Sequence, residues 1–486
     1  MARIEQTNVP DWSALIPVLP QSGPRRVALY AELRRLIETG ALPPGAKLPT
    51  TRDLAARLGL SRGAAVAAFE MLLADGFAQA RVGAGTYVAA QVPQIAPAAP
   101  PPQAPQASES MPQAPDGGPQ AREVAQPLPG TIGVAAPDAR TFQVFRALLT
   151  RHLAQPAPAH FAYGDPRGSL ALREEVAAYL RTARGVRCHA AQVTLTSGSQ
   201  QALDLVIRAA LAPGDKVWIE DPCYPMARAA FAGAGMRLVG VPVDAEGLDP
   251  AVGAARAPEA QAVYVTPSHQ FPLGVTLPMS RRLALIDWAR RAGAWIIEDD
   301  YDSEFRFAGP PLTALQGVDA AGRVIYVGTF SKALFPGIRV GYVVVPEPLL
   351  DAVIAVRNRS DRFPATLAES ALAAFLREGH FSAHLRRARR RARIARDALL
   401  EGLDGAGLAV TAPDQGLHLL AGLPAGSDDV VIVAAARTAG FGPRALSPLY
   451  VDAPPRAGLV IGFSGFPPED LRAAARRWAA GRGLRG

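Results

Sequence analysis

Apolar residues recur at helical spacing near the start of the chain, and the pattern predicts three short helices. The first covers residues 28–37 and is ended by a Gly- and Pro-rich stretch, TGALPPGAKLP. Thr50 or Thr51 is placed to cap a second helix that ends at Gly59, and Ser61 is placed to cap a third. The apolar positions of the first helix are Leu29, Leu33, Leu36 and Ile37.

The stretch after the third helix, FAQARVGAGTYVAA, reads as two strands around a Gly-rich turn. Two helices joined by a tight turn, with Ser61 and Arg62 at the start of the second, have the outline of a helix-turn-helix, and the strands add a wing. A plain three-helix scaffold has the same outline. Charge does not decide between them, because residues 1–90 hold ten Lys or Arg against seven Asp or Glu.

The order and spacing of the motifs favour DNA binding. A Gly-rich turn followed by LPTTRDLA, LGLSR and GAGTYV resembles the winged-helix domain of the GntR regulators. Ala64 and Ala65 stand where that family usually has a Thr-Val pair, so a hydroxyl that could meet a phosphate is missing. The DNA-binding residues that the resemblance implies are Arg52, Ser61, Arg62, Arg81, Gly83 and Gly85.

Composition changes sharply over residues 91–129, which are rich in Pro, Ala and Gln and almost free of large apolar residues. Such a segment buries too little surface to offset the entropy of ordering, so we expect a disordered linker. The predicted organisation is a DNA-binding domain over residues 1–90, this linker, and a large domain over residues 130–486. We expect a small α+β subdomain of the large domain from about residue 350.

Strand-like and helix-like stretches alternate through the large domain, which predicts an α/β fold with a mainly parallel sheet of seven-stranded type. One short strand runs into Ser197, Gly198 and Ser199, and a helix begins at about Gln200. Backbone N–H groups and the positive end of the helix meet there, as in a phosphate cradle. An ordinary strand-to-helix turn uses the same residue types.

Two further strands end next to side chains that could take part in a reaction. One ends on Glu298, Asp299 and Asp300, followed by Tyr301, although helix capping or solvated charge would also explain these acids. The other precedes Lys332, in a chain that holds three lysines. A buried lysine amine forms a Schiff base with an aldehyde, and a carboxylate keeps a pyridine nitrogen protonated. Those are the needs of pyridoxal 5'-phosphate (PLP).

From about Tyr163 to the C-terminus the chain resembles the class I aminotransferases of fold type I. The resemblance implies that Lys332 forms the internal aldimine and that Asp299 pairs with the pyridinium nitrogen. Tyr301 would bind the phenolic oxygen and Tyr224 would stack on the ring. Tyr163 would reach the phosphate of a partner subunit, so we expect a homodimer. The phosphate-binding residues implied are Ser199, Gln200, Ser331 and Arg339.

Two positions depart from the enzyme pattern. Phe271 stands where those enzymes usually have an Asn that holds the ring oxygen. Val460 stands where the arginine that clamps a substrate carboxylate is expected, and Arg456 is near but not at that position. Both departures argue against efficient transamination.

A GntR-like head on an aminotransferase-like body is the layout of the MocR (GabR- and PdxR-like) regulators. The stretches TPSHQFPLG, EDDYDSEFR and GHFSAHLRRARRRARIARDAL also resemble that subgroup. The resemblance implies a PLP-dependent transcription regulator that binds double-stranded operator DNA. It would sense an amine-type effector, or the vitamin cofactor itself, through Lys332. The alternatives are an active aminotransferase with an accessory head, and a DNA-binding protein whose large domain only dimerises.

Charge and cysteine content narrow the class further. The net charge of +8 permits nucleic-acid binding, but the arginines between Arg386 and Arg396 spread around a helix and are expected to be solvated. Two cysteines give neither a disulfide framework nor metal-ligand spacing, so we expect no metal site and a reducing cytoplasm. No apolar run approaches the ~20 residues of a spanning helix, so we expect no membrane contact.

Overall fold

The computed structural model describes residues 19, 24–92, 126–135, 137–154, 162–309 and 312–482. It divides into two compact units, Met1–Ala121 and Arg122–Gly486, which we call the head and the body. Residues 93–125, most of the expected linker, lie outside the described residues.

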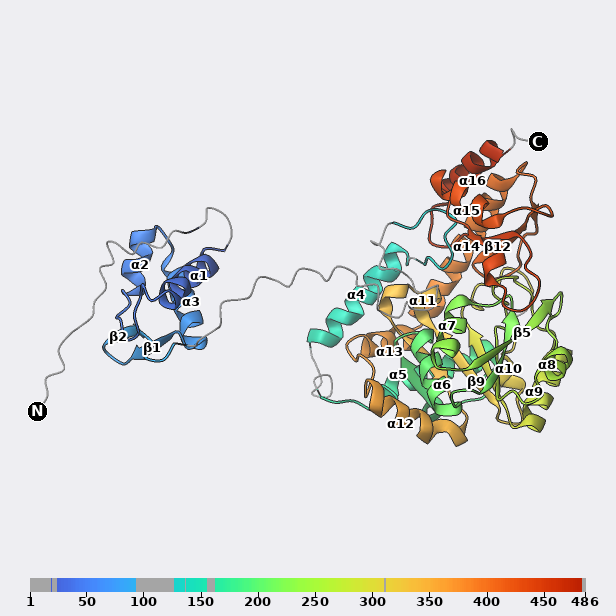
Figure 1. Ribbon diagram of the computed structural model, residues 1–486, viewed down its shortest axis with the longest axis horizontal. Helices are drawn as coiled ribbons and strands as arrows, with labels where there is room; N and C mark the ends of the chain where they lie inside the picture. The colour runs from blue at the N-terminus through green and yellow to red at the C-terminus, as the bar shows by residue number, and fades with distance from the viewer. Residues whose placement is uncertain are drawn as a thin grey trace, which may run out of the picture. The chain divides into compact units, whose positions relative to one another are not determined.

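The described head is three helices and a hairpin (Figure 1). Its elements are α1 (Arg25–Glu38), α2 (Thr51–Leu58), α3 (Arg62–Ala74), β1 (Ala78–Arg81) and β2 (Gly85–Val88). Thr50 caps α2 by accepting the N–H of Asp53 at 3.1 Å, and Ser61 caps α3 by accepting the N–H of Ala64 at 3.2 Å. Apolar residues of all three helices and of both strands share one core. The predicted helix-turn-helix and wing are confirmed.

The body is built on an eight-stranded sheet of order β3-β10-β9-β8-β7-β4-β5-β6. Strands β4, β5, β7, β8 and β9 run parallel, whereas β10 is antiparallel to both β3 and β9. The predicted mainly parallel sheet is confirmed, and the additional strand is the two-residue β6 at one edge. The strands are β3 (Val193–Thr196), β4 (Lys216–Asp221), β5 (Arg237–Asp244), β6 (Gly247–Leu248), β7 (Ala262–Val265), β8 (Trp295–Asp300), β9 (Val324–Thr329) and β10 (Gly341–Val344).

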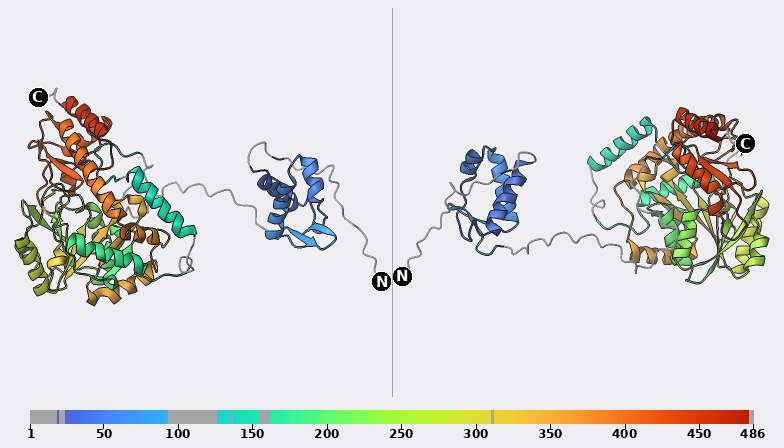
Figure 2. Two further views of the ribbon diagram at one scale, coloured as in Figure 1. Left: turned by 180° about the vertical axis from the view of Figure 1, so that it is seen from behind. Right: turned by 45° about the horizontal axis from the view of Figure 1, so that its top comes forward.

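Helices connect these strands and bury both faces of the sheet, which is why β7, the first half of β8 and most of β9 are apolar. The α4 helix lies along an edge of the body in all three ribbon views (Figures 1 and 2). The helices up to residue 377 are α4 (Ala139–Ala154), α5 (Leu170–Arg184), α6 (Ser199–Ala210), α7 (Pro225–Gly233), α8 (Pro250–Arg256), α9 (Met279–Ala292), α10 (Leu315–Val318), α11 (Phe330–Ala333), α12 (Leu350–Ser360) and α13 (Glu369–Arg377).

A second, antiparallel sheet of order β11-β12-β14-β13 forms the C-terminal part of the body. Its strands are β11 (Ala409–Val410), β12 (His418–Gly422), β13 (Arg444–Ala445) and β14 (Gly458–Gly462), with helices α14 (His380–Leu403), α15 (Asp429–Thr438) and α16 (Pro468–Arg482). Residues 128–130 pack here too, since Pro129 and Gly130 carbonyls accept the N–H groups of Gly442 and Gly462. The end of the expected linker is thus part of this fold.

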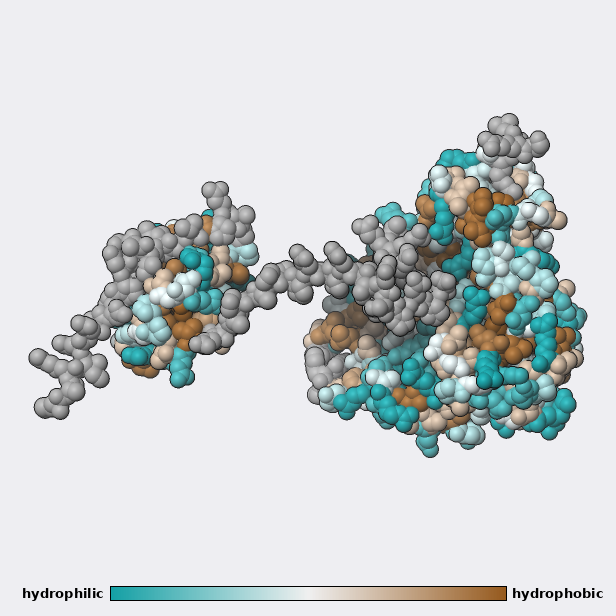
Figure 3. All heavy atoms as spheres, in the orientation of Figure 1, coloured by the Kyte–Doolittle hydropathy of each residue, from teal (hydrophilic) through white to brown (hydrophobic). Residues whose placement is uncertain are grey.

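The face of the body seen in Figure 3 is largely polar, and its apolar side chains form small separate patches. Within the described ranges, none of the helices combines the length and the apolar character needed to cross a membrane. In α14 the arginines do spread around the helix: Arg387 and Arg391 bind Asp138, whereas Arg386, Arg390 and Arg393 are exposed.

Candidate functional site

The three acids at the end of β8 have three different environments. Glu298 accepts the N–H groups of Leu315 and Gln316, each at 2.8 Å, and so caps α10. Asp300 pairs with the buried Arg184 at 2.8 Å. Asp299 accepts the Tyr264 hydroxyl at 2.7 Å through one oxygen, while its other oxygen is buried and has no hydrogen-bond partner among the described residues. The cluster is therefore partly structural, as one interpretation of the sequence allowed.

Asp299 is the acid with an unsatisfied oxygen. It is 4% exposed, and burial raises its pKa to about 6, an effect that the Tyr264 hydroxyl opposes. A buried acceptor without a donor is costly unless a ligand supplies the missing hydrogen bond. The N–H of a protonated pyridine ring would satisfy it, so this position fits the role that the sequence resemblance implies.

Lys332 lies in α11, directly after β9, where the Thr329 side chain caps the short helix by accepting the N–H of Ser331 at 3.1 Å. Its amine donates to the Gly133 carbonyl at 3.1 Å. Burial lowers the pKa of Lys332, and the charges of Asp302 and Asp299 oppose that effect. A lowered pKa leaves more amine unprotonated near neutral pH, which is the form that reacts with a carbonyl group.

Two of the predicted phosphate-binding residues, Ser199 and Gln200, begin α6. Gly198 has φ 103°, a conformation that favours glycine, and directs the chain from β3 into the helix. The Arg339 guanidinium lies at this turn, because a Cβ added to Gly198 would be 3.4 Å from its Nη1. The Gln200 amide instead donates to the Met226 carbonyl at 3.1 Å, which leaves its backbone N–H for a ligand. The Ser331 hydroxyl is 3.0 Å from Thr329 Oγ1.

Three aromatic side chains, Tyr224, Phe271 and Tyr301, pack together, and we call them the aromatic wall. The rings of Tyr224 and Phe271 meet edge to face at 5.6 Å, and Phe271 and Tyr301 do so at 6.4 Å. The Tyr301 hydroxyl donates to the His269 carbonyl at 3.0 Å and must turn to reach a ligand. Tyr163 is 76% exposed, and its ring contacts Phe363 and Arg362 instead of these residues.

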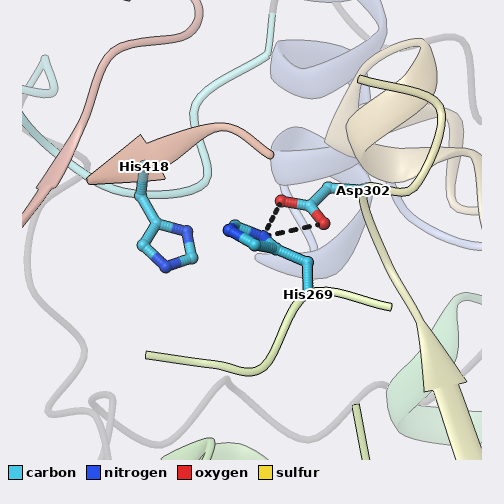
Figure 4. Close-up of side chains that lie close together, drawn as sticks. All are labelled: His269, Asp302 and His418. Carbon is cyan, nitrogen blue, oxygen red and sulfur yellow. Dashed lines mark hydrogen bonds and ion pairs between the residues drawn. The ribbon is translucent and has the colours of Figure 1, made fainter. Parts of the chain in front are cut away.

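A histidine pair lies beside this wall, with the His418 ring centroid 5.4 Å from that of Phe271 and the His269 centroid 6.1 Å from that of Tyr301. Figure 4 shows the pair together with Asp302. His269 Nδ1 donates to Asp302 at 3.0 Å, and His418 Nε2 faces the Pro272 carbonyl at 3.2 Å. The remaining His269 nitrogen, Nε2, is buried and unpaired within the described part of the chain. The three side chains offer ligand atoms within 4.8 Å of one another, a group that could hold a metal ion. The sequence predicted no metal site, because that expectation depended mainly on cysteine spacing.

Sequence reasoning did not identify Tyr264, Gly133 or the histidine pair. Tyr264 lies in β7, next to β8, and its hydroxyl is the one that binds Asp299. A hydroxyl in the middle of an otherwise apolar strand, AVYV, was an available signal. The histidine pair is brought together only by contact between the loop after β7 and the C-terminal sheet, so no local pattern indicates it.

The residues predicted to contact DNA are all exposed on the head; they are Arg52, Ser61, Arg62, Arg81, Gly83 and Gly85. Arg62 is the first residue of α3, and its side chain makes no ion pair within the described head. The Arg81 guanidinium lies 4.5 Å from the centroid of the Tyr87 ring, which holds it at the base of the wing. Gly83 forms the wing turn with φ 74°. The Ser61 hydroxyl is already used as a helix cap.

Two family models match the chain. The model of the bacterial regulatory proteins of the gntR family matches residues 25–88, and that of aminotransferase class I and II matches residues 136–440. The body resembles a kynurenine aminotransferase of Pyrococcus horikoshii, with a TM-score of 0.68 and 27% identity over 74% of this chain and 92% of that one.

Full-length relatives share both parts. The probable rhizopine catabolism regulatory protein MocR of Rhizobium meliloti is 36% identical, with 92% of each chain covered. The pyridoxine biosynthesis transcriptional regulator PdxR of Corynebacterium glutamicum is 32% identical, covering 94% of this chain and 96% of its own. The chain therefore belongs to the MocR-type GntR transcription regulators, which join a DNA-binding head to an aminotransferase-like body.

Proposed function

We propose that this regulator binds PLP in the body and that the bound cofactor is its sensing group. The observation that supports the proposal best is the buried Asp299 oxygen that has no hydrogen-bond partner among the described residues. It lies at the end of β8, and Lys332 follows the end of the neighbouring parallel strand β9. When bound, PLP supplies an aldehyde that takes up amines and a ring that accepts electrons. The protein's part is to bind and orient the cofactor and to exclude water from it.

Each predicted cofactor residue has a distinct task in this proposal. Lys332 supplies the amine for the aldehyde, and Asp299 keeps the ring nitrogen protonated. Tyr224 covers a ring face, and the Tyr301 hydroxyl turns from the His269 carbonyl to the ring oxygen. The phosphate is held by Ser199, Gln200, Ser331 and Arg339, at the positive end of α6.

We further propose that the head binds operator DNA through the start of α3 and the wing. The exposed Arg62 reads a base edge, while Arg52 and Arg81 contact phosphates beside it. Binding of an amine effector, or of the cofactor itself, changes the body and so changes how the head meets DNA. This coupling requires that the effector bind the two states of the protein with different affinities.

A homodimer is part of the proposal. Large apolar side chains are exposed on and around α4 and α5, where a second copy would cover them; they are Phe142, Leu153, Tyr163, Leu170 and Leu367. Tyr163 would then be available to the phosphate site of the partner. Size measured by light scattering, with Leu153→Asp as a disrupting variant, tests this part.

Turnover as an aminotransferase is the less favoured function. The aromatic-amino-acid aminotransferase 1 of Thermococcus litoralis is 28% identical over 71% of this chain, whereas the named regulators match over more than 90%. Phe271 and Val460 also replace the polar groups that the enzymes are expected to use.

One spectroscopic experiment tests the proposal. Purified protein should show a visible absorbance band that borohydride reduction fixes to Lys332, located by peptide mapping against Lys47 and Lys216. Titration with amines should shift the band, and operator affinity should change in parallel. A protein that takes up no PLP would contradict the proposal, and repeated turnover to keto product would favour the enzyme.

A further inference from the structure

The strand β14 brings Val460 to the aromatic wall of the proposed cofactor pocket. Val460 is fully buried and packs in one cluster with Phe271, Leu446 and Leu449. Tyr224 and Tyr301 are partly buried against the same cluster. The side chain of residue 460 therefore faces the pocket, but valine cannot bind an acid group there.

Arg444 lies directly across the sheet from Val460. Strands β13 and β14 pair antiparallel, with Arg444 opposite Val460 and Ala445 opposite Leu459. Side chains directly opposite each other in an antiparallel pair leave the sheet on the same face. The Arg444 side chain accordingly leaves the sheet on the side of the aromatic wall.

The electrostatics of the wall support this placement. Burial raises the pKa of Tyr224, with the Asp299 charge adding to the rise and Arg444 opposing it, so Arg444 and Asp299 both lie within electrostatic reach of this one ring. Burial also lowers the pKa of Arg444, which Tyr224 opposes and the nearby Arg437 reinforces. Arg444 thus places a positive charge within electrostatic range of the ring expected to cover the cofactor.

Arg444 is exposed to solvent at the edge of the aromatic wall, and it makes no ion pair or side-chain hydrogen bond within residues 126–135, 137–154, 162–309 and 312–482. Arg437 is exposed and likewise has no carboxylate partner there. Arg456, the arginine nearest to Val460 in sequence, has its Nε bonded to the Tyr450 hydroxyl at 3.1 Å. Of these guanidinium groups, Arg444 combines a place at the wall with an unused set of donors.

We propose that Arg444 binds the acid group of the effector, an amino compound that carries one carboxylate or a similar anion. The inference rests on the proposed function, because the amine of the same compound would take the place of the Lys332 amine on the aldehyde carbon of PLP, and Lys332 would be released as the free amine. Guanidinium binds carboxylate through two parallel hydrogen bonds, which fixes orientation as well as charge. Neighbouring strands are about 4.8 Å apart, so the acid group is displaced by roughly that distance from where an arginine at position 460 would hold it.

The test compares effectors that differ only in the acid group. Full-length protein loaded with PLP is titrated with 4-aminobutanoate, 5-aminopentanoate and n-butylamine, and the apparent Kd is read from the visible band. We expect at least one of the acids to bind tighter than n-butylamine. The variant R444Q should reduce that preference by roughly tenfold or more, as expected for loss of a charged hydrogen-bonded contact.

Two variants serve as controls. R444K keeps the positive charge but lacks the two parallel donors of guanidinium, so it should recover part of the preference for acids over n-butylamine. R456Q should leave that preference unchanged. An equal preference for acids in wild type and R444Q, or no preference in wild type, would overturn the proposal.

Failure of the cofactor proposal is distinguishable, because wild-type protein would then show no visible band at all. In that case, binding of the acid group by Arg444 is tested by measuring the heat of binding of 4-aminobutanoate to the colourless protein by calorimetry. Heat that is equal for wild type and R444Q, including none for either, overturns it, and heat lost only in R444Q supports it.

Discussion

The DNA-contact surface of the head and the pocket of the body are built in opposite ways. In the head, the expected contact residues lie within about thirty positions of one another, at the starts of two helices and at the wing, and all are exposed. In the body, they come from the ends of β3, β4, β8 and β9 and from the C-terminal sheet; Asp299 is buried, and most of the others are partly buried. A local site is recognised from its sequence motif, whereas an assembled site depends on the whole fold.

The largest expected effect is that of replacing Lys332, which should remove the cofactor from the body and leave DNA binding by the head intact. Lys332→Ala should abolish the borohydride-fixed cofactor, because Lys47 and Lys216 are the other lysines and neither lies at the pocket. The head should still bind DNA, although its response to effector should be lost. Mass spectrometry of reduced protein and a gel-shift titration check both expectations, with Lys216→Ala as the matched control. Cofactor retained in the K332A protein would remove the proposed sensing chemistry.

The next prediction concerns the cost of burying Asp299. The ordinary pKa of an aspartate is 3.8, whereas that of Asp299 in the folded protein is about 6, so the folded state binds more protons between these pH values. The stability contribution of this group is therefore greatest below about pH 4 and falls by on the order of 3 kcal/mol as the pH rises through 6.

Asp299→Asn removes that cost. The cofactor-free variant should be more stable than wild type above pH 6, by on the order of 1–3 kcal/mol, and equal to it below about pH 4. PLP should be retained less well, since the ring nitrogen loses its anion. Urea unfolding at pH 4 and 8 measures the first effect, with Asp204→Asn as control, a half-exposed carboxylate that pairs with Arg208 on α6. A variant less stable than wild type at pH 8 would contradict the explanation.

In the head, Arg62→Ala should weaken operator binding by about 1–3 kcal/mol if the guanidinium contacts a base edge. The visible band of the body should not change. A gel-shift titration at fixed salt gives the affinity, and the exposed Arg57→Ala, in the last turn of α2, is the comparison. Unchanged affinity would place Arg62 outside the interface.

The smallest effect is expected for Ser61→Ala, at about 1 kcal/mol of local helix stability, because the hydroxyl caps α3. Hydrogen exchange of the first amides of α3 in the full chain should become faster, while exchange in the body stays the same. Ser61→Asp, which also caps, should restore protection but weaken DNA binding through its charge. Equal exchange in wild type and the alanine variant would show that the cap contributes little.

Much of the fold could be predicted from the sequence because its signals are local. The caps at Thr50 and Ser61, the wing turn and the apolar strands each follow from a few neighbouring residues. The resemblance to known families placed Lys332 and Asp299 at one site, and the structure puts both at the same end of the sheet. The phosphate turn at Gly198 and the position of Arg339 beside it also agree with that assignment.

What the sequence did not indicate depends on contacts between distant segments. The partner of Asp299 is Tyr264 on the neighbouring strand, and strand order is not written in either segment. Arg444 leaves the sheet on the same face as Val460 because of their pairing, a register that no local pattern specifies. Gln200 turned to Met226 because α7 packs beside α6, so its side chain stays a predicted phosphate ligand without a contact of that kind in the structure.

The antiparallel strand β10 has a consequence for how long the protein would keep a bound cofactor. Lys332 and Arg339 both lie in the connection between β9 and β10, which pair directly with each other. Anchor and phosphate clamp therefore belong to one hairpin-like segment of the chain. Transient opening of that segment would release both at once, without unfolding of the remaining body. The half-life of the visible absorbance band in dilute protein would then measure the rate at which this one segment opens.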